Sequence, residues 1–73
     1  MKTTTTPPQQ PALRRVRDGY WRVTAASGVV LGYVEQTDAD GVARYRAKRL
    51  FSSLRVVEIG EFGAREEAAE CLR

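Results

Sequence analysis

One short segment of the 73-residue chain carries basic side chains at every second position, where Arg44, Arg46 and Lys48 alternate with alanine and tyrosine. Successive side chains of a β-strand point to opposite faces, so on a strand these cations share one face and the other face can be buried. A rigid row of cations can contact phosphates and base edges of DNA. The same row can also be a solvated outer face that discourages aggregation at a sheet edge.

A second group of basic residues lies near the amino terminus. Residues 1–17 contain Lys2, Arg14, Arg15 and Arg17 and no acid, in a chain with 12 basic and 9 acidic side chains. Such an arm could reach a minor groove or flanking phosphates, or it could be a solubilising linker. Ten of the 12 basic residues are arginine, which favours bidentate contacts with phosphate or guanine, although a GC-rich coding sequence would give the same bias.

The sequence contains few residues that could act in catalysis or bind a metal ion. The chain has no histidine and one cysteine, Cys71, so zinc sites and Cys/His catalysis lack ligands. The serines likewise have no histidine to activate them. Residues 38–41 predict a turn and not a calcium loop, because no bidentate glutamate follows at the required position. We expect no enzyme activity, no metal and no cofactor.

The compartment is predicted from features that the sequence lacks. A single cysteine cannot form an internal disulfide, and no apolar run approaches the roughly 20 residues that span a bilayer. The amino terminus has no apolar core of a signal peptide. We therefore expect a cytoplasmic protein without a membrane partner.

The chain divides into a tail and one small domain. Residues 1–12 are rich in Thr, Pro and Gln and bury too little apolar surface to fold, so they predict a disordered tail. Residues 13–73 predict a single α+β domain that begins with the basic arm. A chain this short buries only about 60% of its unfolded surface, so its core is expected to be thin.

Alternating patterns predict an antiparallel meander of three strands over residues 19–24, 29–35 and 42–50. Residues 54–59 could add a fourth strand or lead in an extended form to a helix. The helix is expected over residues 64–73, with acids in its first turns and apolar residues at helical spacing.

The helix should cover one side of the sheet and leave the other side open. The covered side is expected to carry Val30, Val34, Tyr45 and Ala47. The open side is expected to carry Leu31, Tyr33, Arg44, Arg46 and Lys48, with Arg22 or Trp21 beside them according to the register of the first strand. A slip of one residue would exchange the two sets. Trp21 and Tyr33 could stack on single-stranded bases or pack in the core.

Four short motifs carry a resemblance to a known family. They are Trp21-Arg22-Val23, residues 28–34, Tyr45-Arg46-Ala47, and residues 60–68 followed by Leu72. Over residues 19–72 they resemble the sheet-plus-helix modules that form amino-terminal arm-binding domains of phage-type tyrosine recombinases. The plant ethylene-response type of DNA-binding domain shares that architecture.

This resemblance implies that the open sheet face lies in the major groove of DNA. The corresponding positions here are Arg22, Tyr33, Arg44, Arg46 and Lys48. Residues 50–59 hold more apolar sequence than the family pattern expects. The given sequence departs from the family in having no recombinase catalytic domain after the expected helix, so we expect DNA binding without recombinase activity.

The leading hypothesis is a small non-catalytic DNA-binding protein of phage or mobile-element type, which lays its basic sheet face on duplex DNA. Arg44 and Arg46 would contact the groove, whereas Lys48, Arg22 and the three arginines at positions 14, 15 and 17 would contact phosphates. The alternative is a module that binds an acidic protein. Leu31 and Tyr33 would then be apolar anchors and the arginines a polar rim.

Overall fold

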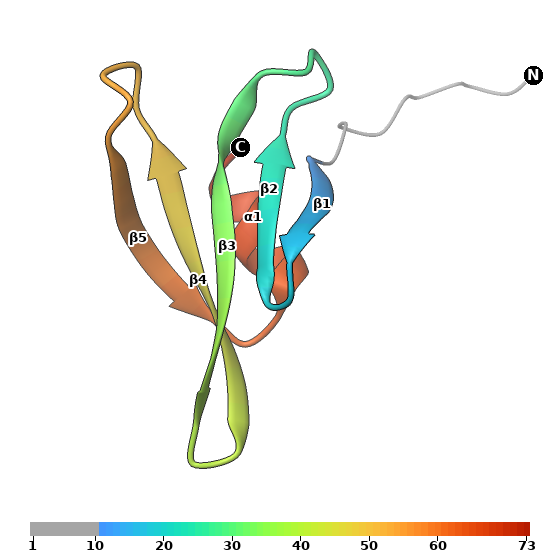
Figure 1. Ribbon diagram of the computed structural model, residues 1–73, viewed down its shortest axis with the longest axis vertical. Helices are drawn as coiled ribbons and strands as arrows, with labels where there is room; N and C mark the ends of the chain where they lie inside the picture. Colours follow the sequence, from blue (N-terminus) through green and yellow to red (C-terminus); the bar gives the residue numbers. More distant parts are fainter. Residues whose placement is uncertain (1–10) are drawn as a thin grey trace, which may run out of the picture.

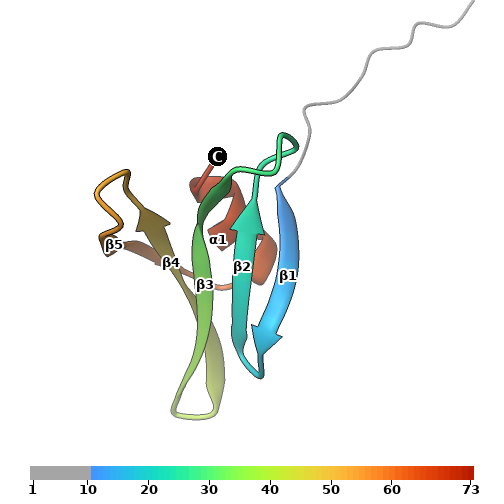
Figure 2. The ribbon, with the colours of Figure 1, turned by 45° about the horizontal axis from the view of Figure 1, so that its top comes forward.

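The computed structural model describes residues 11–73, which form a single antiparallel sheet and one helix. The elements are β1 (Ala12–Arg17), β2 (Tyr20–Thr24), β3 (Val30–Ala39), β4 (Val42–Leu50), β5 (Val56–Phe62) and α1 (Arg65–Cys71). Each strand pairs with the next along the chain, and α1 lies against one face of the sheet (Figures 1 and 2). The predicted α+β class with a carboxy-terminal helix is confirmed, but the sheet has five strands and not three or four.

Strand β1 occupies the segment that was expected to be a basic arm. Its sequence Ala-Leu-Arg-Arg-Val-Arg has no alternation of apolar and polar residues. It becomes a strand because its backbone pairs with β2, from Ala12 opposite Thr24 to Arg17 opposite Tyr20. The expected disordered tail falls on residues 1–12, of which residues 1–10 lie outside the described part of the chain and Ala12 begins β1.

Strand β5 begins two residues after the start of the possible fourth strand over residues 54–59 and extends three residues beyond its end. It pairs with β4 from Val56 opposite Leu50 to Phe62 opposite Tyr45. The register shifts between Ala47 and Lys48, so β5 contains one extra residue, Ile59. Such a bulge explains why alternation along β5 is weak, because one residue is inserted into an otherwise regular ladder.

The core lies between the helix and one face of the sheet. Its buried residues are Trp21, Val23, Val34, Ala47, Ala68, Ala69 and Leu72, with Leu13, Leu31, Tyr45 and Phe62 packed against them. Val34, Tyr45 and Ala47 therefore lie on the covered side as predicted.

The predicted sides of Val30 and Leu31 were wrong. The β2–β3 register shifts between Val23 and Thr24, which leaves Leu31 as an extra residue in β3. Leu31 packs against the core, whereas Val30 lies opposite Thr24 and outside the core cluster. A bulge at this point moves every side chain before it to the other face, and the sequence pattern did not reveal it.

Gly32 is placed where two backbones approach closely. A Cβ atom at this position would overlap the carbonyl oxygen of Lys48 and lie 3.0 Å from its carbonyl carbon. The absence of a side chain therefore allows β3 to lie against β4.

Strands β3 and β4 continue beyond their neighbours as a two-stranded arm. β2 pairs with β3 only up to Glu35, and β5 pairs with β4 only up to Tyr45, so the hairpin end projects from the sheet (Figure 1). Asp40 and Gly41 have φ of 55° and 77°, as a two-residue hairpin turn requires. The predicted turn is thus confirmed, but it is shorter than the expected connection over residues 36–41.

Candidate nucleic-acid interface

The face of the sheet opposite the helix, here called the open face, is built from two rows of side chains. One row contains Arg14, Arg22, Tyr33, Lys48 and Glu58, which lie opposite one another on successive strands. The other row contains Arg17, Tyr20, Glu35, Arg46 and Glu61. Each row crosses about 19 Å, because neighbouring strands lie about 4.8 Å apart.

The structure brings most of the sequence-predicted residues together on this face. Seven of the candidates lie there by register and alternation: Arg14, Arg17, Arg22, Tyr33, Arg44, Arg46 and Lys48. Arg15 does not, because it lies opposite Trp21 on the helix side. The choice between Arg22 and Trp21 is settled for Arg22, since Trp21 is only 8% exposed and belongs to the core.

Two cations of the predicted stripe are paired with acids. The Nζ atom of Lys48 lies 2.6 Å from Oε1 of Glu35. The Nε atom of Arg46 lies 3.7 Å from Oε2 of Glu61 and 3.9 Å from Oε2 of Glu58. The charge of Lys48 and Arg46 is therefore shared with carboxylates of the neighbouring strands. Sequence reasoning missed Glu58 and Glu61 because it left open whether residues 54–59 form a strand. It did not name Glu35, although it expected residues 29–35 beside residues 42–50.

The hydrogen bond from Lys48 lowers the pKa of Glu35, against the opposing effect of partial burial. The charges of Lys48, Arg46 and Arg17 lower this pKa further. Because these cations all stabilise the carboxylate, Glu35 stays ionised on the open face at neutral pH.

Four arginines of the open face have no such partner. Within residues 11–73, no carboxylate lies within ion-pair distance of Arg14, Arg17, Arg22 or Arg44. The face holds six basic and three acidic side chains by register, so its net charge is 6 − 3 = +3. The unpaired cations lie mainly on β1 and β2, whereas the acids lie on β3 and β5.

Two tyrosines lie between the unpaired and the paired cations. The rings of Tyr20 and Tyr33 are stacked, with centroids 5.5 Å apart and an angle of 6° between their planes. The guanidinium of Arg17 lies 4.5 Å from the centroid of Tyr20. Tyr20 is thus contacted from both neighbouring strands, and the pair is not an open platform on which an unpaired base could stack.

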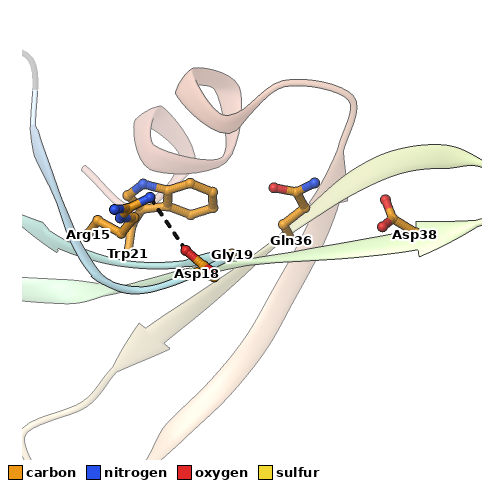
Figure 3. Close-up of a pocket in the computed structure, with 6 residues that line it drawn as sticks. All are labelled: Arg15, Asp18, Gly19, Trp21, Gln36 and Asp38. Atoms are coloured by element: carbon orange, nitrogen blue, oxygen red, sulfur yellow. Dashed lines mark ion pairs between the residues drawn. The ribbon is translucent and has the colours of Figure 1, made fainter.

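A shallow cavity of about 440 Å³ lies on the other side of the sheet (Figure 3). It is lined by Arg15, Asp18, Gly19, Trp21, Gln36 and Asp38. Arg15 and Asp18 form an ion pair of 3.5 Å, with side chains 67% and 100% exposed. Solvent screens so exposed a pair, and one arginine beside two aspartates does not select an anion.

Other kinds of site find no support in the part of the chain that the structure describes. Residues 11–73 contain no cluster of three or more His, Cys, Asp or Glu side chains that could hold a metal ion. None of their helices has the length and apolar character needed to cross a membrane. Cys71 is exposed and forms no disulfide.

Comparison of the chain with protein-family models, with curated proteins and with solved structures found no match. The function must therefore be argued from the geometry and charge of the open face.

Proposed function

We propose that this chain is a small non-catalytic DNA-binding protein that lays its open face on duplex DNA. The observation that carries the proposal is the pairing of Arg14 with Arg22 across β1 and β2, next to Arg17. Like charges held opposite one another on a sheet destabilise it, and no carboxylate within residues 11–73 relieves them. A polyanion such as the phosphate backbone would relieve this repulsion.

The geometry favours a duplex over a single strand. Binding of single strands relies on aromatic rings that are free to stack on bases, whereas Tyr20 is already stacked on Tyr33 and contacted by Arg17. Arginines on a rigid sheet can instead make bidentate contacts with phosphates or guanine edges. We assign the main contacts to Arg14, Arg17, Arg22 and Arg44, and a weaker contribution to Arg46 and Lys48, because carboxylates share their charge.

Neighbouring arginines on β1 provide a matched test. Arg14 lies on the open face, whereas Arg15 lies on the helix side and pairs with Asp18. Binding would be measured by fluorescence anisotropy of a labelled duplex of roughly 20 base pairs across a salt series, since phosphate contacts release counterions. Arg14→Gln is expected to weaken binding about three- to tenfold at low salt and to reduce the salt slope by about 1. Arg15→Gln should leave both quantities nearly unchanged.

Two results would overturn the proposal. Equal effects of Arg14→Gln and Arg15→Gln would mean that binding is diffuse attraction and does not use the open face. No binding of the duplex at low salt would mean that the unpaired arginines are a solvated surface.

The alternative of a module that binds an acidic protein has less support. Leu31, one of its two expected anchors, packs against the core, and Tyr33 is half-buried against Tyr20. An arginine rim without an apolar anchor gives little affinity for a protein. Affinity capture from lysate separates the two functions, because nuclease treatment releases partners held through nucleic acid and leaves a bound protein in place.

A further inference from the structure

The turn between β4 and β5 ends in exposed apolar side chains. Leu54 is 81% exposed and Phe51 is 42% exposed. Both views show that this turn stands clear of the helix and of the other strands (Figures 1 and 2). These side chains lie outside the core cluster, so they are accessible to a ligand.

The backbone holds Leu54 in an unusual conformation. Its φ of 67° lies in the left-handed region, where glycine or asparagine is favoured and a leucine side chain is strained. The backbone N–H of Leu54 donates to the carbonyl oxygen of Phe51 at 2.8 Å, and the N–H of Phe51 donates to that of Arg55 at 2.9 Å. The turn is thus fixed by its own hydrogen bonds, and it presents a large apolar side chain where a small polar one would be more stable.

The residues around the tip include basic side chains and no acid. Residues 49–57 contain two basic residues, Arg49 and Arg55. Arg55 follows Leu54 in the turn, whereas Arg49 lies opposite Gly32 on the helix side of the sheet. Neither has a carboxylate within ion-pair distance among residues 11–73.

Leu50 on β4 pairs with Val56 on β5 and lies two positions after Lys48. By alternation, both residues therefore lie on the open face and extend it toward the tip. The tip therefore suits a polyanionic ligand that can also bury an apolar side chain.

We propose that Leu54, with Phe51 beside it, acts as a wedge that enters a base step of duplex DNA. Arg55, next to Leu54 in the turn, contacts a flanking phosphate. Apolar side chains that enter a base step unstack it and kink the duplex, and flexible steps such as TA yield most easily. This inference rests on the proposed function and deepens it, because it adds a deformation of the DNA to contacts with its backbone.

An anionic lipid surface could also attract an apolar tip beside an arginine. The duplex is favoured because the tip continues the face that carries Arg14 and Arg22, where one long polyanion can reach both regions. The apolar part of the tip is also small, with only two large side chains beyond the last strand pair.

The test uses the full chain and a duplex with 2-aminopurine at a central TA step. Unstacking of this base raises its fluorescence, and anisotropy of the same duplex reports binding independently. Leu54→Asn removes the apolar side chain and suits the left-handed backbone, whereas Leu54→Met keeps the apolar character. Val42→Thr changes an exposed apolar side chain, 52% exposed, at the opposite end of β4.

The wild-type protein, Leu54→Met and Val42→Thr are expected to raise the fluorescence on saturation. Leu54→Asn should abolish the rise and weaken binding only about three- to tenfold, because the phosphate contacts remain. Circular dichroism of each variant confirms that it is folded.

The outcomes separate this inference from the proposed function. Saturable binding without a rise in fluorescence overturns the wedge and leaves DNA binding intact. A rise that persists in Leu54→Asn also overturns the wedge. No binding of the duplex overturns both, and binding to vesicles of anionic phospholipid that Leu54→Asn abolishes, without unstacking of DNA, assigns the tip to a lipid surface.

Discussion

Lys48 on β4 reaches diagonally to Glu35 on the adjacent strand β3, and its Nζ atom lies 2.6 Å from the carboxylate Oε1. The lysine stands opposite Tyr33 in one row of the open face, and the glutamate stands opposite Arg46 in the other row. Both side chains are largely covered, with 25% and 32% exposed. The pair thus connects the two rows and removes one cation from the charge that the face offers to a ligand.

This pair predicts a pH-dependent contribution to stability. The hydrogen bond from Lys48 lowers the pKa of Glu35 in the folded protein below its ordinary value of 4.5. The contribution is therefore complete above pH 4.5 and is lost as the pH falls through the lower folded pKa. Glu35→Gln should reduce the free energy of unfolding by up to about 1 kcal/mol at pH 7, and this difference should shrink as the pH falls below 4.5.

Urea unfolding of the wild-type protein and of Glu35→Gln from pH 7 to pH 3 measures this difference. Glu67→Gln is a suitable control, since Glu67 is exposed and has no ion pair among residues 11–73. A difference between wild type and Glu35→Gln that does not change with pH would contradict the assignment to ionised Glu35.

The close approach of β4 to the backbone at Gly32 predicts that this position tolerates no side chain. The Cβ of Gly32→Ala would overlap the carbonyl oxygen of Lys48, and backbone atoms cannot move away as a flexible side chain can. We expect a loss of about 3 kcal/mol or more in the free energy of unfolding, which is large for so small a domain. Gly63→Ala is the matched control, because its Cβ would meet no atom within 4 Å. Equal thermal stability of the two variants would show that β3 and β4 separate at little cost.

The burial of Leu72 predicts that its side chain contributes strongly to holding the helix against the sheet. It is fully buried, and only the alanines Ala68 and Ala69 accompany it as buried residues of the helix segment. Leu72→Ala should cost about 2–5 kcal/mol, because it removes the largest of the fully buried side chains of the core. Cys71→Ala, at the exposed neighbouring position, should cost less than about 0.5 kcal/mol. Chemical denaturation that shows similar midpoints for both variants would contradict this account of the core.

The ion pairs of Glu58 and Glu61 with Arg46 predict that removing these two carboxylates strengthens DNA binding. Both carboxylates lie within 4 Å of Nε of Arg46 and place negative charge on the proposed DNA surface. Glu58→Gln combined with Glu61→Gln would free Arg46, so we expect duplex affinity at low salt to rise about tenfold. The measurement is the same anisotropy titration.

The control for this variant changes the same number of charges on the helix. Glu66→Gln combined with Glu70→Gln removes the partners of Arg65 and Arg73, away from the open face. An equal gain in both double variants would show that net charge alone, and not Arg46, determines the affinity.

The sequence by itself determined the class of fold and the composition of one strand. Alternation is a local property, so it predicted β4 and separated Tyr45 and Ala47 from the three cations between and beside them. The helix was predicted over residues 64–73 and is present over Arg65–Cys71, because acidic residues and alanines at helical spacing also act locally.

Only the tertiary structure decided which charges are free. β1 has no alternating pattern and forms through backbone pairing with β2, which places Arg14 opposite Arg22. A bulge places Leu31 against the core, and β5 brings Glu61 to Arg46. Register between strands depends on contacts between distant parts of the chain, and one inserted residue reverses the face of every side chain that follows it. The charge of the open face is therefore a property of the sheet and not of any single strand.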